Sequence, residues 1–384
     1  MGFRNILLTG TEYIFIGILL GEMGLEFLDR HALLQLEPFL IFGLGWIGFL
    51  FGVQFEVRQL KKMPKRFFTI TVFQSAITFL LVSSVIFLIL RRVIFWKESF
   101  ILIMALTLGS AASCTAPAAL AIVSRSFRFT NQKLLDFLRY ISAVDGLLAL
   151  IFFTIALCVV PAAEITDFNL IRSLEWFGIS ILMGIIPGLI LIFLSKVRFS
   201  DQEFILFLVG TVMFCGGLAD TLNHSPLIAG FICGILTANF CRHRLRALST
   251  VLQAEKSIYI MLLLILGAGW DFELLASLVV VFGYFCARII GKVLGNFLAP
   301  RLWDPGFKPP VMVGLGLISE GGLTVAIILN FKLLYPLYSE ILITTVIIST
   351  FLNEWISPRL ILAQFGKNRQ SSNKEFSPKT NLLK

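Results

Sequence analysis

The stretch from Arg139 to Val159 reads RYISAVDGLLALIFFTIALCV. After its first residues it is almost entirely apolar, and its length suits an α-helix that crosses a bilayer with a hydrocarbon core of about 30 Å. Asp145 interrupts this run, about two helical turns from the Arg139 end. An ionisable group in hydrocarbon is costly and usually functional. The stretch therefore predicts a membrane helix that carries a functional carboxylate.

Similar apolar runs fill the rest of the chain. Of its 384 residues, 57% are hydrophobic and 14% are charged, against about 45–50% and about 25% in soluble domains. A soluble fold is excluded, because runs of about 20 apolar residues follow one another almost without a gap. We therefore expect an all-α integral membrane protein. The runs predict about twelve transmembrane helices, at 6–24, 36–55, 67–90, 98–124, 135–160, 173–195, 203–220, 225–240, 257–270, 274–297, 310–331 and 337–361.

The positions of Lys and Arg indicate the orientation of these helices. The formal net charge is +9, but the positive residues lie in the gaps between apolar runs, which argues against a nucleic-acid partner. Most of them fall in one set of alternate gaps, and short cytoplasmic loops retain such residues. The other set of gaps holds only Arg30, Arg91, Arg92, Lys97, Arg172 and Lys332. We expect a multi-pass protein of the inner (plasma) membrane with both termini in the cytoplasm.

Asp145 has two interpretations. In the structural one, it is paired permanently with an internal Arg or Lys. In the functional one, which we favour, it alternately takes a proton and a cation. Burial brings the charged and neutral forms of a carboxyl group closer in free energy, so both ligands can compete for one charge.

A second feature is the interruption of the apolar run 98–124 by the polar residues Ser113 and Thr115 and by Pro117. Proline removes a helix hydrogen bond and biases the preceding residue away from helical geometry. In lipid, a broken helix is tolerated only where it is buried or lines a cavity, and transporters use such breaks to build ion sites. The alternative is a simple proline kink.

The run 310–331 has a matching interruption at Glu320 and Gly321. Two interrupted helices at comparable places in the two halves predict inverted repeats with two broken helices that cross. Glu320 is either a second titratable group or the partner of a basic residue.

Two basic residues lie inside the apolar run 274–297. Arg288 and Lys292 are four residues apart and so share one helix face. Facing a broken-helix carbonyl end or Asp145, they would compensate negative charge. The alternative for Lys292 is that its side chain reaches the cytoplasmic surface. We interpret His224, between two predicted spans, as a solvated loop residue.

Other stretches carry a resemblance to a known family. They are GILLGEMGL at 17–25, LGWIGFLFGVQFEVRQLKK at 44–62, HSPLIAGFICGILTAN at 224–239 and ILITTVIISTFLNEWISPRL at 341–360. Together with the interrupted helices, they make nearly the whole chain similar to the sodium/hydrogen exchanger superfamily. It resembles in particular the Kef/NapA-like branch of monovalent cation:proton antiporters.

The first half of the chain has counterparts of that superfamily's functional motifs. CTAP at 114–117 resembles its first broken helix, with Thr115 and Pro117 in place and Ala116 where many members have Asp. AVDGLLAL at 143–150 resembles its ion-site helix, in which Asp145 matches either member of a paired motif.

The second half has counterparts as well. ARIIGKVLG at 287–295 resembles the helix with the family's basic residue, which corresponds to Arg288 or Lys292. GLISEGGL at 316–323 resembles the second broken helix, with Glu320 where Arg is usual.

The resemblance implies an NhaA/NapA-like antiporter fold and a homodimer that exchanges Na⁺ or K⁺ for H⁺ by an elevator-like motion. Asp145 would bind the cation with the help of Thr115. Because the ion-site helix has a single carboxylate, we expect an electroneutral exchange. The alternatives are a sodium-coupled carrier of a small organic anion and a degenerate homologue that does not transport.

We expect one transmembrane domain at 1–362, followed by a disordered cytoplasmic tail at 363–384. No enzymatic motif such as HExxH is present in the sequence, so we expect a transporter without a cofactor or a resident metal.

Overall fold

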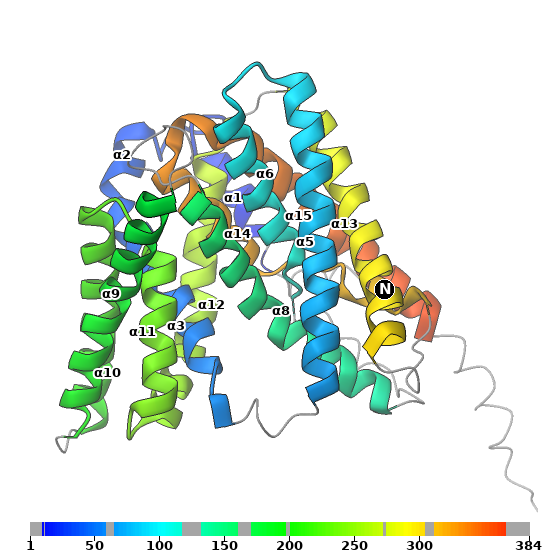
Figure 1. Ribbon diagram of the computed structural model, residues 1–384. Helices are drawn as coiled ribbons and strands as arrows, with labels where there is room; N and C mark the ends of the chain where they lie inside the picture. Colours follow the sequence, from blue (N-terminus) through cyan, green and yellow to red (C-terminus); the bar gives the residue numbers. More distant parts are fainter. Residues whose placement is uncertain are drawn as a thin grey trace, which may run out of the picture.

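A computed structural model describes Gly10 and residues 12–58, 65–116, 132–159, 170–196, 200–271, 274–303 and 311–365. The regular elements of these residues are thirteen α-helices and two short 3₁₀ helices. Most of the helices fall into two bundles that lie beside each other (Figure 1).

The first bundle packs around the contact between α3 and α11. Its members are α1 (Glu12–Leu20), α3 (Glu37–Gln54), α9 (Leu170–Leu194), α10 (Asp201–Thr221), α11 (Pro226–Phe240) and α12 (Arg244–Ala268). Serines begin two of these helices, since Ser200 forms a capping box with Glu203 and the Ser225 side chain accepts a hydrogen bond from the Ile228 amide.

The second bundle packs around the contact between α5 and α13. Its members are α5 (Lys65–Val93), α6 (Glu98–Ser113), α8 (Gln132–Val159), α13 (Leu274–Trp303), η2 (Val311–Leu317), α14 (Gly322–Leu334) and α15 (Glu340–Phe365). The short helices α2 (Arg30–Gln35) and η3 (Pro336–Tyr338) lie in connections.

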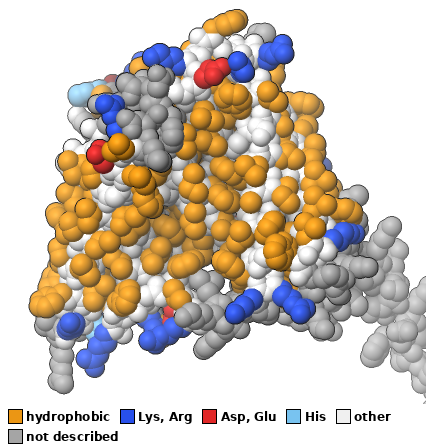
Figure 2. All heavy atoms as spheres, viewed as in Figure 1, with side chains coloured by type: hydrophobic (Ala, Val, Ile, Leu, Met, Phe, Trp, Pro, Cys, Tyr) orange, Lys and Arg blue, Asp and Glu red, His pale blue; other side chains and the backbone are white. Residues whose placement is uncertain are grey.

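The surface suits a lipid environment. Figure 2 shows a broad belt of hydrophobic side chains, with Lys and Arg above and below it. Eight of the described helices are long and apolar enough to cross a membrane, and α6, α11 and α14 are shorter apolar helices. The chain is therefore a multi-pass α-helical membrane protein, as its composition predicts.

Each predicted span overlaps a described helix, but the number of membrane crossings stays a prediction. The largest difference is at α12, which begins at Arg244 and not near residue 257. Ala247 and Val251 are buried although charged residues surround them in sequence. Arg244, Arg246 and Glu255 therefore lie on a packed helix and do not form a polar loop. At the other end of the chain, α15 extends to Phe365, and the rest of the predicted tail lies outside the described residues.

Candidate functional site

Two interrupted helices meet inside the second bundle. Helix α6 ends at Ser113, and the chain continues in an extended conformation through Cys114. At the second interruption, η2 ends at Leu317 and α14 begins after Gly321, whose backbone is extended. The two extended segments are hydrogen bonded to each other, because the Ala116 amide donates to Ser319 O at 3.0 Å.

The crossing is tight as well as buried. A Cβ atom on Gly321 would lie 3.3 Å from Ala116 of the other segment, so a side chain there would press on the neighbouring backbone. Ser319 Oγ donates to Ala116 O at 3.3 Å. Helix α6 thus ends, and α14 begins, at the two predicted interruptions. Pro117 lies outside the described residues, and the arrangement as inverted repeats stays a prediction.

Asp145 lies next to this crossing and is fully buried. Its Oδ1 accepts hydrogen bonds from Gln74 Nε2 at 2.5 Å and from the Ser75 hydroxyl. Its Oδ2 accepts from Thr115 Oγ1 at 2.8 Å and from Lys292 Nζ at 2.7 Å. These donors come from α5, from the first extended segment and from α13. Each carboxylate oxygen therefore accepts two hydrogen bonds, which fill the acceptor positions of the group.

Lys292 holds the compensating charge. Its side chain is fully buried, so the interpretation that it reaches the cytoplasmic surface is wrong. Besides Asp145, its ammonium group donates to Ser113 O at 2.6 Å and to Thr115 Oγ1 at 2.9 Å. Ser113 is the last residue of α6, where the helix dipole places negative partial charge. The ammonium group thus pairs with both a carboxylate and a helix end.

Arg288 forms a second buried ion pair, with Glu320. Its Nη2 atom also donates to Cys114 O at 2.8 Å. Glu320 receives further hydrogen bonds from Tyr284 OH at 3.2 Å, Ser349 Oγ at 2.7 Å and Thr350 Oγ1 at 2.7 Å. Of the two interpretations of Glu320, the structure favours the partner of a basic residue.

Three residues on the Asp145 side of this site escaped the sequence analysis: Gln74, Ser75 and Asn296. Gln74 and Ser75 are adjacent polar residues in the largely apolar helix α5. Asn296 donates to Gln74 Oε1 at 3.3 Å. A signal was present, because Asn296 repeats the four-residue spacing of the two basic residues on α13.

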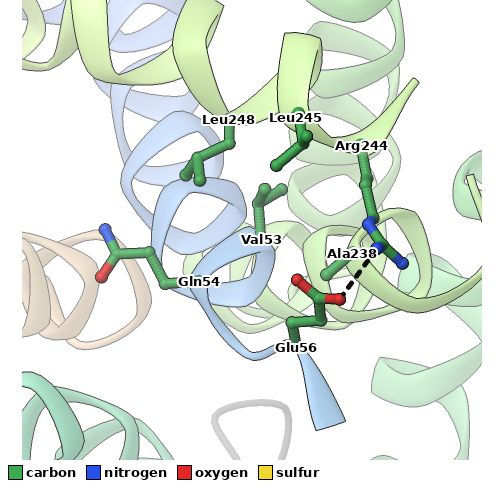
Figure 3. Close-up of a pocket in the computed structure, with 7 residues that line it drawn as sticks. All are labelled: Val53, Gln54, Glu56, Ala238, Arg244, Leu245 and Leu248. Carbon is green, nitrogen blue, oxygen red and sulfur yellow. Dashed lines mark ion pairs between the residues drawn. The ribbon is translucent and has the colours of Figure 1, made fainter. Parts of the chain in front are cut away.

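A separate cavity lies in the first bundle. It has a volume of about 160 Å³ and lies where α3 and α11 end and α12 begins. Figure 3 shows its lining, with Arg244 Nη2 at 3.1 Å from Glu56 Oε1. None of its lining residues contacts Asp145 or Glu320 through a hydrogen bond that the structure describes. The ionisable groups that form the candidate site therefore lie elsewhere.

His224 differs from its predicted environment. It is buried, and its ring stacks on Trp176 with the ring centroids 5.0 Å apart. Burial lowers the pKa of His224. The interpretation as a solvated loop residue is therefore wrong: tertiary packing against α9 covers this turn.

The chain is similar to known proteins in sequence and in fold. The family model described as "Sodium/hydrogen exchanger, transmembrane" matches residues 10–361. Among solved structures, the chain is similar to the sodium proton antiporter MjNhaP1 from Methanocaldococcus jannaschii at pH 8. The two chains are 18% identical, the TM-score is 0.63, and the match covers 93% of this chain and 91% of the other. At that identity the likeness shows the fold. A comparison with curated proteins gives no match.

Proposed function

The chain belongs to the sodium/hydrogen exchanger family, and on that premise we propose that Asp145 is the group at which it exchanges a monovalent cation, Na⁺ or K⁺, for a proton. The environment of Asp145 is the main observation in support of this proposal. A fully buried carboxylate lies where two broken helices cross, with the hydroxyls of Ser75 and Thr115 in hydrogen-bonding contact. Carboxylate, hydroxyl and carbonyl oxygens are the ligands that hard cations take.

The pairing with Lys292 is compatible with exchange. A primary ammonium group and a monovalent metal ion carry the same charge, so Lys292 neutralises Asp145 when no cation is bound. Lys292 also has two other acceptors, Ser113 O and Thr115 Oγ1. It therefore keeps partners for its charge when a cation or a proton takes over the carboxylate.

This arrangement favours electroneutral exchange. Asp145 offers one negative charge, Lys292 has a second acceptor at the carbonyl end of α6, and Glu320 is engaged with Arg288. One cation would then leave for each proton that arrives. An electroneutral exchange should give the same proton flux with and without an imposed membrane potential.

An elevator-like motion is supported by where the partners of Asp145 come from. Gln74, Ser75, Thr115 and Lys292 all belong to the second bundle or its extended segment. The second bundle can thus move past the first without breaking the site. We further propose a homodimer in the plasma membrane, in which residues 1–362 form the membrane domain and both termini are cytoplasmic.

The decisive experiment is a flux measurement on Asp145→Asn. Purified protein in vesicles that contain a pH-sensitive dye should show proton flux driven by Na⁺ or K⁺ gradients. The substitution removes the charge for which cation and proton compete, so we expect flux to fall to that of empty vesicles. Glu22→Gln is a matched control, since Glu22 is an exposed carboxylate paired with Arg30.

If Asp145→Asn retained wild-type flux, Asp145 would be a structural ion-pair partner and the proposed site would be wrong. A wild-type protein without flux in any cation gradient would instead support a homologue that does not transport.

A further inference from the structure

Two buried side-chain amides lead to Asp145: Gln74 on α5, which is 0% exposed, and behind it Asn296 on α13, which is 1% exposed. Gln74 Nε2 donates to Asp145 Oδ1 at 2.5 Å and to Ser75 Oγ at 2.9 Å. At the other end of the pair, Asn296 Nδ2 donates to Gln74 Oε1 at 3.3 Å and to Lys292 O at 2.9 Å. The amides therefore form a short chain that ends on the carboxylate.

The direction of this chain follows from the neighbours. An ionised carboxylate only accepts hydrogen bonds, so Gln74 must turn its NH₂ group toward Asp145 and its oxygen toward Asn296. Asn296 then faces two acceptors, Gln74 Oε1 and Lys292 O, and must present its own NH₂ group to both. Its Oδ1 is left buried without a hydrogen-bond partner among the described residues. A buried acceptor without a hydrogen bond destabilises the state that contains it.

A cation at Asp145 reverses these requirements. The NH₂ group of Gln74 would be repelled by the cation, whereas its carbonyl oxygen would be attracted. The terminal torsion of a glutamine is soft and roughly two-fold, so a half-turn exchanges the two groups without moving the helix. After this turn, Gln74 presents Oε1 to the cation and Nε2 to Asn296.

Asn296 can answer the turn, since its Oδ1 has no hydrogen-bond partner to lose among the described residues. Rotating its amide brings Oδ1 to Gln74 Nε2. The rotation gives up the bond to Lys292 O and turns Oδ1 toward that carbonyl, a cost that the cation at Asp145 must offset. We infer that the Gln74–Asn296 amide pair is a donor–acceptor switch, in which Gln74 is a direct cation ligand that sets cation preference and Asn296 is a positioning residue that holds it. This inference rests on the proposed exchange at Asp145.

The test is the cation dependence of proton flux in vesicles, with Na⁺, Li⁺ and K⁺ compared. Gln74→Met keeps the length of the side chain but removes the amide. We expect its KM for Na⁺ to rise about tenfold or more, the loss of one charge-assisted contact, with a smaller change in kcat. We also expect the ratio of KM values among the three cations to change.

Two further variants separate ligation from packing. Gln74→Glu keeps an oxygen at the same place, so its KM for Na⁺ should not rise as that of Gln74→Met does. Asn296→Leu removes the acceptor that receives Gln74 Nε2 in the cation-bound state, so its KM should rise severalfold. Thr78→Val is a matched control one turn along α5, where the hydroxyl donates to the Gln74 carbonyl of its own helix, and it should behave as wild type.

The outcomes distinguish this inference from the proposed function. Wild-type KM values and cation ratios in Asn296→Leu and in Gln74→Met would overturn the amide switch while leaving exchange at Asp145 intact. If Gln74→Met does not fold, the other two variants still decide. A raised KM for Na⁺ in Gln74→Glu would overturn the switch, and so would an unchanged KM in Asn296→Leu. Absence of flux in the wild type would overturn the proposed function itself.

Discussion

Thr115 joins the two charges of the candidate site. Its hydroxyl donates to Asp145 Oδ2 at 2.8 Å and accepts from Lys292 Nζ at 2.9 Å. A hydroxyl has one proton and two lone pairs, so it can do both at once. It can also turn its proton to Leu317 O, 3.3 Å away in the second broken helix. Such a group can follow a change of occupant at Asp145 without leaving a buried partner unsatisfied.

We therefore predict that Thr115→Val slows exchange. Valine has nearly the same shape but can neither donate to Asp145 nor accept from Lys292. Loss of a hydrogen bond to a charged group costs about 1.5–3 kcal/mol, so we expect the flux at low Na⁺ to fall about tenfold or more. Initial rates of dye-detected proton flux would measure this.

The controls for this prediction are Thr115→Ser and Thr345→Val. The serine keeps the hydroxyl and should retain most of the flux. Thr345 is also buried, but its hydroxyl donates to Ile341 O of its own helix, so its loss should change little. Equal flux in Thr115→Val and the wild type would contradict a role for this hydroxyl.

At the scale of elements, the first bundle depends on a close contact between α3 and α11. Their glycines meet the opposite backbone in both directions. A Cβ on Gly48 would collide with Leu227 O, and one on Gly230 would collide with Gly45 O. Small residues at such spacing let membrane helices approach closely, because packing and not the hydrophobic effect drives their association in lipid.

We predict that Gly48→Ala destabilises the protein. The added methyl group has no space, so the two helices must separate, and overpacking of this kind costs about 1–3 kcal/mol. The midpoint of thermal unfolding in detergent should fall. Gly210→Ala is the matched control, because a Cβ there meets no atom within 4 Å. Equal midpoints for the two variants would show that the α3–α11 contact is loose.

At the scale of the whole molecule, polar contacts join the two bundles through α14 and α15. Asn330 Oδ1 accepts from Ser225 Oγ at 3.0 Å, at the start of α11. Lys332 Nζ donates to Gly269 O at 2.6 Å, at the end of α12, and Trp270 Nε1 donates to Thr344 Oγ1 at 2.8 Å. Movement of the second bundle past the first would have to break these contacts.

A cross-link between the bundles tests the elevator-like motion. In a background without the native cysteines, Ser225→Cys combined with Asn330→Cys would place two thiols where a hydrogen bond now joins the bundles. Oxidation to a disulfide, or a short bis-methanethiosulfonate cross-linker, should abolish proton flux, and reduction should restore it.

The matched control joins Val57, three residues after α3, to Asn239 of α11, because the Val57 amide donates to Asn239 Oδ1. The same treatment of Val57→Cys combined with Asn239→Cys should leave the flux unchanged. Full flux in the cross-linked Ser225–Asn330 variant would contradict relative motion of the bundles at this contact.

Local properties of the chain were enough to predict the fold class and to single out the residues at the centre of the candidate site. Hydropathy marks the helices, because each apolar run must face lipid or a neighbouring helix wherever it lies. Asp145, Arg288 and Lys292 stand out because a charge in hydrocarbon is costly. Small polar residues in apolar runs indicate both interruptions. These signals depend only on residues within one or two helical turns.

Only the tertiary structure decided which buried polar and charged residues pair with one another. Lys292 and not Arg288 reaches Asp145, Arg288 holds Glu320, and Gln74 joins the site from 71 residues away along the chain. Hydropathy does not encode such choices, because they depend on how helices distant in sequence are rotated and shifted against one another. For the same reason, the lack of a hydrogen-bond partner for Asn296 Oδ1 among the described residues appears only once the neighbours on α5 and α13 are in place.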